Sequence, residues 1–168
     1  SAIDLYAIAR RTRACGAALV IDASQSLGAM PFDFDGIGAD FVISAGHKWL
    51  LGAQGLGWLW AADRWRHDGQ PLEQTWVARE GRENYGVTDG ALPRYRAGAR
   101  RFDFGGHLAP INLAMAQAGM AQLQQWGVAA VSRRLDALNT HLGTRLRAAG
   151  LADWVQAGHV PHFRALKP

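Results

Sequence analysis

Two stretches of sequence decide the fold: residues 17–25 read AALVIDASQ, and residues 40–48 read DFVISAGHK. In each, a short continuous apolar run ends abruptly at polar residues, which is typical of a strand that is buried on both faces of a sheet. We therefore predict strands over residues 17–21 and 40–44. A third apolar run, at residues 57–61, predicts a further strand, and tight glycine-containing turns mark the ends of these runs.

Helices are expected both before and after these strands in the sequence. Residues 2–14 have apolar side chains on one helical face, and Ser1 with Asp4 resembles a capping box. Further helices are expected over residues 110–126 and 128–149, which Gly127 and Gly150 end. Helices combined with short buried strands predict an α/β fold.

Two other segments are less regular. Residues 63–107 are rich in charged residues, glycine and proline and show no clear period. A loop of this length inside a compact domain is usually functional or packs on another chain. We expect the tail, residues 157–168, to start another strand.

Composition narrows the class of protein. The chain has 168 residues, 49% hydrophobic and 19% charged, which suits one globular core and argues against disorder. It has no run of eighteen apolar residues and no visible leader, so we expect no membrane span. The single cysteine, Cys15, excludes an internal disulfide framework and a multi-cysteine metal site, and it fits a reducing, cytoplasmic setting. We expect Cys15 to be buried and no metal to be bound.

The net charge of +4 does not indicate a nucleic-acid partner, because the arginines are scattered and do not alternate with aromatic residues. Lysine is scarce, with only Lys48 and Lys167 in the chain. Lys48 lies in an apolar region, where a lysine is rarely tolerated without a function.

Polar residues follow the first two predicted strands. Asp22, Ser24 and Gln25 follow the first, and His47 and Lys48 follow the second. Because ligands of open parallel sheets bind at the carboxyl ends of the strands, these side chains are expected to meet in one crevice. An Asp after a strand is often only a helix cap, but the whole set is a much stronger signal.

The segments VIDASQSLG at residues 20–28 and DFVISAGHKWLLG at residues 40–52 resemble the class V aminotransferase family. That family includes cysteine desulfurases, selenocysteine lyases, kynureninases and isopenicillin-N-epimerase-like proteins. Residues 55–60 and 98–106 are similar to two further stretches of it. The resemblance implies a fold-type-I enzyme that uses pyridoxal 5′-phosphate (PLP), with a mainly parallel sheet flanked by helices in its large domain.

The same resemblance implies a domain division. Residues 1–126 correspond to the C-terminal portion of the large PLP-binding domain, and residues 127–168 to the linking helix and the truncated start of the small domain. Because the family's chains are more than twice as long, we expect an interior fragment that is inactive by itself.

Residue roles also follow from the resemblance. Lys48 is the expected catalytic residue, because its amine forms a Schiff base with the PLP aldehyde and moves the proton on the α carbon of the substrate. Asp22 is expected to pair with the protonated pyridine nitrogen through a charge-assisted hydrogen bond. Gln25 is expected to contact the 3-oxygen of the ring, and His47 the phosphate. The implied cofactor-binding residues are therefore Asp22, Gln25, His47 and Lys48.

The sequence departs from the family's pattern at several positions. Ala45 stands where a hydroxyl residue is common, and Ala53 stands where proline is usual. Gly105 and Gly106 stand where desulfurases carry Gly-Thr, and with His107 they separate this chain from the desulfurase branch.

The sequence therefore predicts a PLP-dependent enzyme that acts on a small amino-acid substrate through Lys48. One alternative is a cysteine desulfurase or selenocysteine lyase, which in many members needs a catalytic cysteine beyond Pro168. Another is a non-catalytic module that kept the scaffold. The resemblance also implies a homodimer, because members of the family share the cofactor site between subunits.

Overall fold

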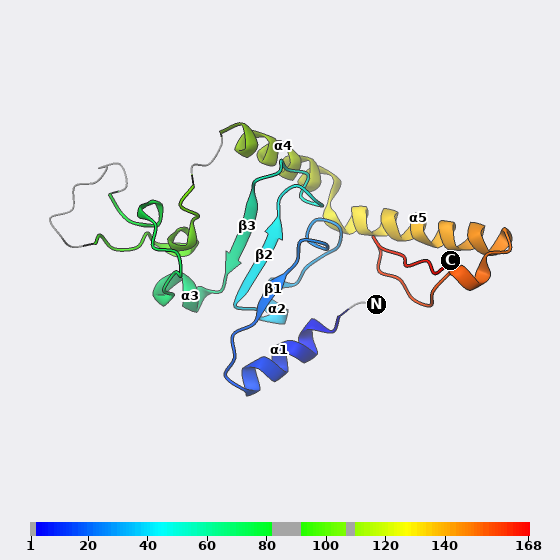
Figure 1. Ribbon diagram of the computed structural model, residues 1–168, viewed down its shortest axis with the longest axis horizontal. Coiled ribbons are helices and arrows are strands. Elements are labelled where there is room, and N and C mark those ends of the chain that lie inside the picture. Colours follow the sequence, from blue (N-terminus) through cyan, green and yellow to red (C-terminus); the bar gives the residue numbers. More distant parts are fainter. Residues whose placement is uncertain (1–2, 82–91, 107–109) are drawn as a thin grey trace.

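The computed structural model describes residues 3–81, 92–106 and 110–168 (Figure 1). In chain order its elements are α1 (Leu5–Ala14), β1 (Val20–Asp22), α2 (Phe34–Ile37), β2 (Phe41–Ala45), β3 (Gly57–Ala61), α3 (Asp63–Asp68), η1 (Trp76–Ala78), η2 (Gly98–Phe102), α4 (Pro110–Trp126), α5 (Val128–Ala148) and η3 (Ala152–Trp154). The predicted helices and the three predicted strands are therefore present, and the α/β class is confirmed.

The three strands form one sheet in the order β1-β2-β3. β1 and β2 are parallel, and Val20 lies opposite Phe41. β2 and β3 are antiparallel, and Ala45 lies opposite Gly57. The sheet is therefore mixed, because the short connection between β2 and β3 reverses the chain, whereas the longer connection through α2 returns it in the same direction.

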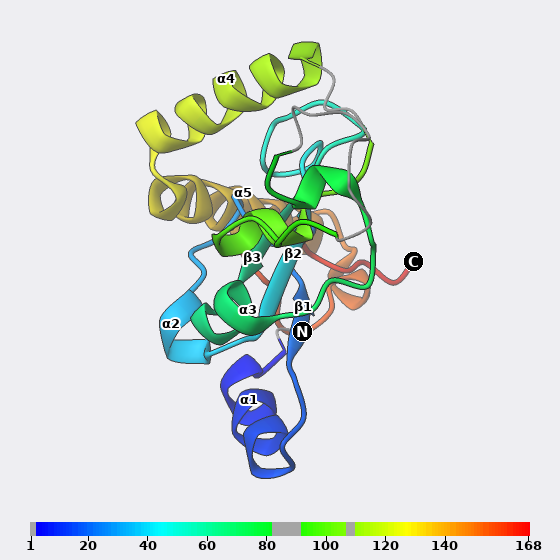
Figure 2. The same ribbon diagram turned by 90° about the vertical axis from the view of Figure 1, so that its left-hand side faces the viewer.

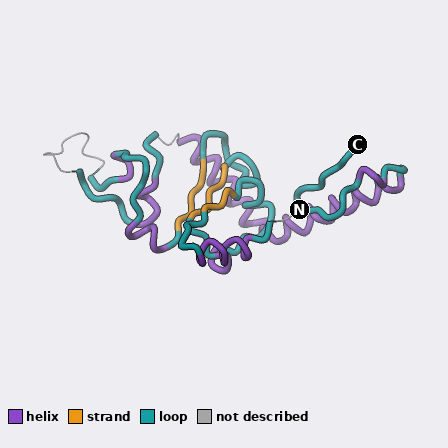
Figure 3. Tube along the Cα trace, turned by 60° about the horizontal axis from the view of Figure 1, so that its bottom comes forward, coloured by secondary structure: helices purple, strands orange, loops and turns teal. Residues whose placement is uncertain are grey.

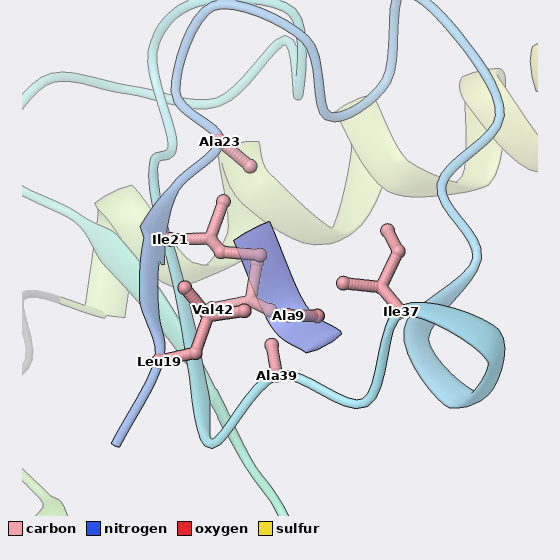
Figure 4. Packing of buried hydrophobic residues seen from close by; sticks show 7 residues of the cluster. All are labelled: Ala9, Leu19, Ile21, Ala23, Ile37, Ala39 and Val42. Carbon is pink, nitrogen blue, oxygen red and sulfur yellow. The ribbon is translucent and has the colours of Figure 1, made fainter. Parts of the chain in front are cut away.

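The hydrophobic core fills one face of this sheet. Its buried side chains gather between the strands and helices α1 and α2 (Figure 4): Ala9, Leu19, Ile21, Ala23, Ile37, Ala39 and Val42. Partly buried aromatic side chains, among them Phe34 and Trp60, extend the cluster. Alternation along β1 and β2 places Ile21 and Val42 on this face.

The opposite face of the sheet is open, which corrects the prediction of strands buried on both faces. Val20 is 58% exposed, Ile43 37% and Leu59 41%. The continuous apolar runs place apolar side chains on both faces of the sheet. Within the described residues, other elements fully cover only one of these faces. The first strand is also shorter than predicted, because Ala17 and Ala18 are exposed and pairing with β2 begins only at Val20.

The start of α1 and the position of Cys15 differ from expectation. Asp4 is itself the N-cap, and its Oδ1 accepts a hydrogen bond from the Ala7 N–H at 2.9 Å, so the helix begins at Leu5. The predicted capping box placed Asp4 inside the helix. Cys15 is the C-cap of α1 and is exposed, because the chain leaves the helix there before it reaches the core.

The C-terminal segment folds back along α5, which extends away from the sheet (Figure 3). The Asn139 side chain donates a hydrogen bond to the Pro161 carbonyl at 2.6 Å, and Arg164 Nε donates one to the Asn139 carbonyl at 3.0 Å. His162 lies edge-on to Trp49, with ring centroids 5.3 Å apart. Residues 157–168 form isolated bridges, so the strand expected there is not present.

The segment predicted as a long loop contains α3 and the two short helices η1 and η2 in its described parts. His107, which the sequence analysis singled out, lies outside the described residues. Among the described helices, none combines the length and apolar character needed to cross a bilayer. The boundary between residues 126 and 127 falls at the turn between α4 and α5, and the domain division there stays a prediction.

Candidate functional site

The first part of the site is the turn that follows β1. Asp22 is the last residue of β1 and is exposed. Its Oδ1 accepts a hydrogen bond from the Ser24 N–H at 2.9 Å. The Ala23 N–H donates to the Ile43 carbonyl at 2.8 Å, so the pairing of β1 with β2 continues one residue past the strand. The Ser24 N–H therefore holds the Asp22 carboxylate, and the bond from Ala23 to β2 fixes the backbone next to it.

The second part is the turn that follows β2 and carries His47 and Lys48. The Gly46 N–H donates to the Leu56 carbonyl at 2.8 Å, and the Gly52 N–H donates to the Gly46 carbonyl at 2.8 Å. These two bonds close the turn. His47 and Lys48 are exposed on it, so Lys48 follows an apolar strand without being buried.

Close backbone packing fixes the position of this turn. A Cβ atom at Gly28 would overlap the Trp49 carbonyl, and one at Gly119 would lie 2.5 Å from the Leu51 carbonyl oxygen. Glycine at these two positions lets the first turn and helix α4 approach the backbone of residues 49–51. Helix α4 lies across the end of the sheet where the site is found (Figure 1 and Figure 2).

The two turns are joined by Ser24. Its Oγ accepts a hydrogen bond from the Ala45 N–H at 2.8 Å. Ala45 is the last residue of β2 and stands three residues before Lys48. The sequence analysis placed Ser24 among the polar residues but assigned it no role. The available signal was a hydroxyl residue between Asp22 and Gln25 at a strand end.

Asp22 ends β1 and Lys48 follows β2 at the same edge of the sheet, and the electrostatics of Asp22 agree with this placement. Hydrogen bonding by the Ser24 side chain, followed by that from the Ser24 N–H, holds the pKa of Asp22 below its ordinary value. Burial opposes this shift, and the positive charge of Lys48 adds to it. Asp22 is therefore an anion at neutral pH, and it is close enough to Lys48 to respond to its charge.

The structure thus brings the four predicted residues to one end of the sheet. Asp22 and Gln25 lie on the turn after β1, and His47 and Lys48 lie on the turn after β2; Gln25 is exposed like the other three. A hollow of about 400 Å³ lies over the open face of the sheet, lined by Val20, Ile43 and Leu59 among others. None of the four residues lines it, so we place the candidate site at the strand ends and not in this hollow.

The fold is that of an α/β protein, and the candidate site lies at the carboxyl ends of neighbouring parallel strands, where such sheets bind ligands. The model of the family described as aminotransferase class-V matches residues 2–160. The chain therefore belongs to the aminotransferase class-V family.

Known proteins similar to this chain include YcbU of Bacillus subtilis (strain 168), described as an uncharacterized aminotransferase. It is 30% identical over 162 residues, which are 94% of this chain and 41% of that protein. Two solved structures share the fold. A cysteine desulfurase from Thermococcus onnurineus NA1 has a TM-score of 0.65 at 21% identity, over 86% of this chain and 35% of that one. A C-DES mutant with glycine covalently linked to its PLP cofactor has a TM-score of 0.61 at 23% identity, over 82% and 34%. This chain spans less than half the length of these proteins.

The donor set at the strand ends fits PLP chemically. A protonated pyridine nitrogen requires an anion beside it, and Asp22 is an anion at neutral pH. An aldehyde requires an amine, and Lys48 presents one on the adjoining exposed turn. Within the described residues, no group of three or more His, Cys, Asp or Glu side chains could hold a metal ion.

Proposed function

We propose that this chain is the lysine-bearing part of a PLP-dependent enzyme that acts on an amino acid, with transamination as its reaction. The observation that carries the proposal is the parallel pairing of β1 and β2, which brings Asp22 and the turn with Lys48 to the carboxyl ends of adjacent strands. Membership of the aminotransferase class-V family and the PLP named in one structural relative support the choice of cofactor.

In this proposal each residue has a separate role. Asp22 holds the proton on the pyridine nitrogen, Gln25 donates to the ring oxygen, and His47 binds the phosphate. Lys48 Nζ would hold the cofactor at its aldehyde carbon, and the same amine would be the base that moves a proton at the α carbon of the substrate. PLP, when bound, supplies an electron sink for the charge that develops at that carbon.

The desulfurase alternative is favoured by the fold of the Thermococcus onnurineus protein. It needs a cysteine nucleophile near the cofactor. Cys15 caps α1 just before the amino end of β1, whereas Asp22 and Lys48 follow the carboxyl ends of β1 and β2 (Figure 1). Cys15 is therefore placed at the wrong end of the sheet for that role, and the alternative depends on the cysteine that the sequence analysis expects beyond Pro168. The relative that matches 94% of this chain is described as an aminotransferase, and this supports transamination.

Covalent labelling tests the proposal. The natural polypeptide that carries this segment is incubated with PLP, reduced with borohydride and digested, and the labelled lysine is identified by mass spectrometry. Lys48 is expected to carry the label, and Lys48→Ala is expected to abolish both this label and the cofactor's visible absorbance band.

Lys167→Ala is the matched control, because Lys167 is the other lysine of the segment and is exposed near the C-terminal end. It is expected to leave the labelling unchanged. A parent protein whose Lys48 stays unlabelled at saturating PLP would overturn the proposal.

Two further proposals belong to the whole protein. We propose that it is a homodimer, which the exposed apolar side chains of Leu72, Leu92 and Phe104 support. We also propose that it works in the cytoplasm, which the single, unpaired Cys15 supports; an export assay with a reporter fused to the natural polypeptide tests this.

A further inference from the structure

Ser24 touches both halves of the candidate site. Its backbone N–H donates to Asp22 Oδ1 at 2.9 Å, and its Oγ accepts from the Ala45 N–H at 2.8 Å. Asp22 ends β1, and Ala45 ends β2 just before the turn that carries Lys48. Ser24 therefore contacts the carboxylate through its backbone amide and the lysine-bearing turn through its half-buried side chain.

The hydrogen bond from the Ala45 N–H to Ser24 Oγ takes the place of a backbone hydrogen bond between the two strands. The last backbone hydrogen bond between the β1 segment and β2 runs from the Ala23 N–H to the Ile43 carbonyl at 2.8 Å. Two residues further along β2, the Ala45 N–H lies on the same side of the strand, but the chain after β1 has already turned away. The Ser24 hydroxyl supplies the acceptor there. Without it a partly buried amide would lose its partner, which is costly.

We propose that Ser24 is a positioning residue that holds the Asp22 carboxylate beside the turn that carries Lys48. What Asp22 and Lys48 do with PLP rests on the proposed function. The positioning itself is a property of this chain and can be measured without any cofactor.

The charge on Asp22 agrees with this role. Hydrogen bonding by the Ser24 side chain is the largest contribution to the lowered pKa of Asp22, ahead of the Ser24 N–H and of the charge on Lys48. Ser24 therefore favours the ionised carboxylate, which is the form that a protonated pyridine nitrogen requires.

The neighbouring Ser26 provides a matched control. It lies on the same turn and is also half-buried, but its Oγ donates to the Ala23 carbonyl, at 3.3 Å, and not to Asp22 or Ala45. Removing that hydroxyl leaves the Asp22 and Ala45 contacts intact. Ser26→Ala therefore separates a general effect of losing a serine in this turn from the specific effect of losing Ser24.

The test compares Ser24→Ala, Ser24→Thr and Ser26→Ala in the natural polypeptide. Without cofactor, Ser24→Ala is expected to speed hydrogen exchange of the Ala45 amide by about tenfold and to raise the NMR-measured pKa of Asp22. With PLP added, its dissociation constant is expected to rise by about tenfold. Ser24→Thr keeps the hydroxyl and is expected to restore all three values, and Ser26→Ala is expected to match the parent.

The outcomes separate this inference from the proposed function. If Ser24→Ala matches Ser26→Ala in Ala45 exchange and in the Asp22 pKa, the positioning role is wrong, even if PLP labels Lys48. If both values change while the parent never labels Lys48, the positioning stands and the proposed function fails.

If Ser24→Ala does not fold by circular dichroism, Ser24→Cys takes its place, because it keeps the volume while sulfur accepts hydrogen bonds weakly. Parent-like Ala45 exchange in Ser24→Cys would overturn the inference.

Discussion

At the scale of single residues, the buried carboxylate of Asp40 joins β1, β2 and α3. Its Oδ2 accepts from the Leu19 N–H at 2.7 Å, and its Oδ1 accepts from Trp65 Nε1 at 2.6 Å and Arg64 Nε at 2.8 Å. Burial acts to raise the pKa of Asp40, but these hydrogen bonds, with the charge of Arg64, outweigh it and hold the pKa below the ordinary value. The sequence analysis treated Asp40 only as the start of a strand.

Asp40→Asn is expected to lower the free energy of unfolding by about 2–3 kcal/mol, because an amide cannot replace the ionised acceptor for three donors. A carboxylate with a lowered pKa stabilises the fold above its unfolded-state pKa, and that contribution is lost as the pH falls through the folded-state value. The parent should therefore lose stability below a pH near the ordinary value of 3.8, and the variant should lose less there.

Urea denaturation from pH 7 down to pH of about 2.5 measures both effects. Asp63→Asn is the control, because Asp63 makes only exposed pairs with Arg66 and His67 on α3, and exposed pairs contribute little. Equal stability losses in the two variants would contradict the role given to Asp40.

At the scale of elements, the lysine-bearing turn depends on helix α4. Gly119 of α4 faces the carbonyls of Leu50 and Leu51, and Ala116 lies close to Gly52. Small residues on this face of α4 let the helix lie directly on the backbone of the turn. Periodicity predicted the helix, but it did not predict which face meets the turn, because that contact joins residues far apart in the sequence.

Gly119→Ala is expected to lower the free energy of unfolding by about 1–3 kcal/mol, since its Cβ would lie 2.5 Å from the Leu51 carbonyl oxygen and the turn would have to move. Gly143→Ala in α5 is the matched control. The atoms nearest to its Cβ would belong to the Arg164 guanidinium, the first at 3.2 Å, and a side-chain shift of a few tenths of an ångström would relieve that contact, so with the better helix propensity of alanine the stability should change by less than about 1 kcal/mol.

Thermal and urea unfolding of both variants measure the difference. If Gly119→Ala and Gly143→Ala lose the same stability, or both gain stability, the close contact between α4 and the lysine-bearing turn does not contribute as expected.

At the scale of the whole molecule, apolar side chains remain exposed on the segment between β3 and α4. Leu72 is 103% exposed and Phe104 is 75% exposed, and both lie in the part of the sequence that shows no regular hydrophobic period. Exposed apolar groups of this size are typical of surfaces that meet another chain. They support the proposed homodimer.

The double variant Leu72→Glu, Phe104→Glu is expected to shift the natural polypeptide from dimer to monomer, because two charges would have to be desolvated at the interface. Light scattering after size-exclusion chromatography measures the mass. Leu138→Glu is the control: Leu138 is 48% exposed on α5, outside this segment, and the substitution should leave the mass unchanged. A double variant that stays dimeric would exclude this surface as the interface.

The sequence by itself determined the three strands of the sheet, the long helices and the residues that gather at the strand ends, but it wrongly predicted a strand in residues 157–168. Apolar runs and helical periodicity are local properties, and parallel strands bring their carboxyl ends to one edge. Asp22, Gln25, His47 and Lys48 could therefore be predicted as neighbours. The same local patterns could not show that one sheet face is open, that Asp4 caps α1, or that Cys15 is exposed.

Only the tertiary structure decided how the site is held. The Ser24 bond to Ala45, the three donors on Asp40 and the approach of Gly119 to Leu51 each join residues that are well separated along the chain. A hydroxyl or a glycine in such a position has no periodic signature, because its partner is set by how strands and helices pack in space. The sequence alone shows which functional groups lie at the strand ends. The contacts that hold these groups in place depend on how the elements pack.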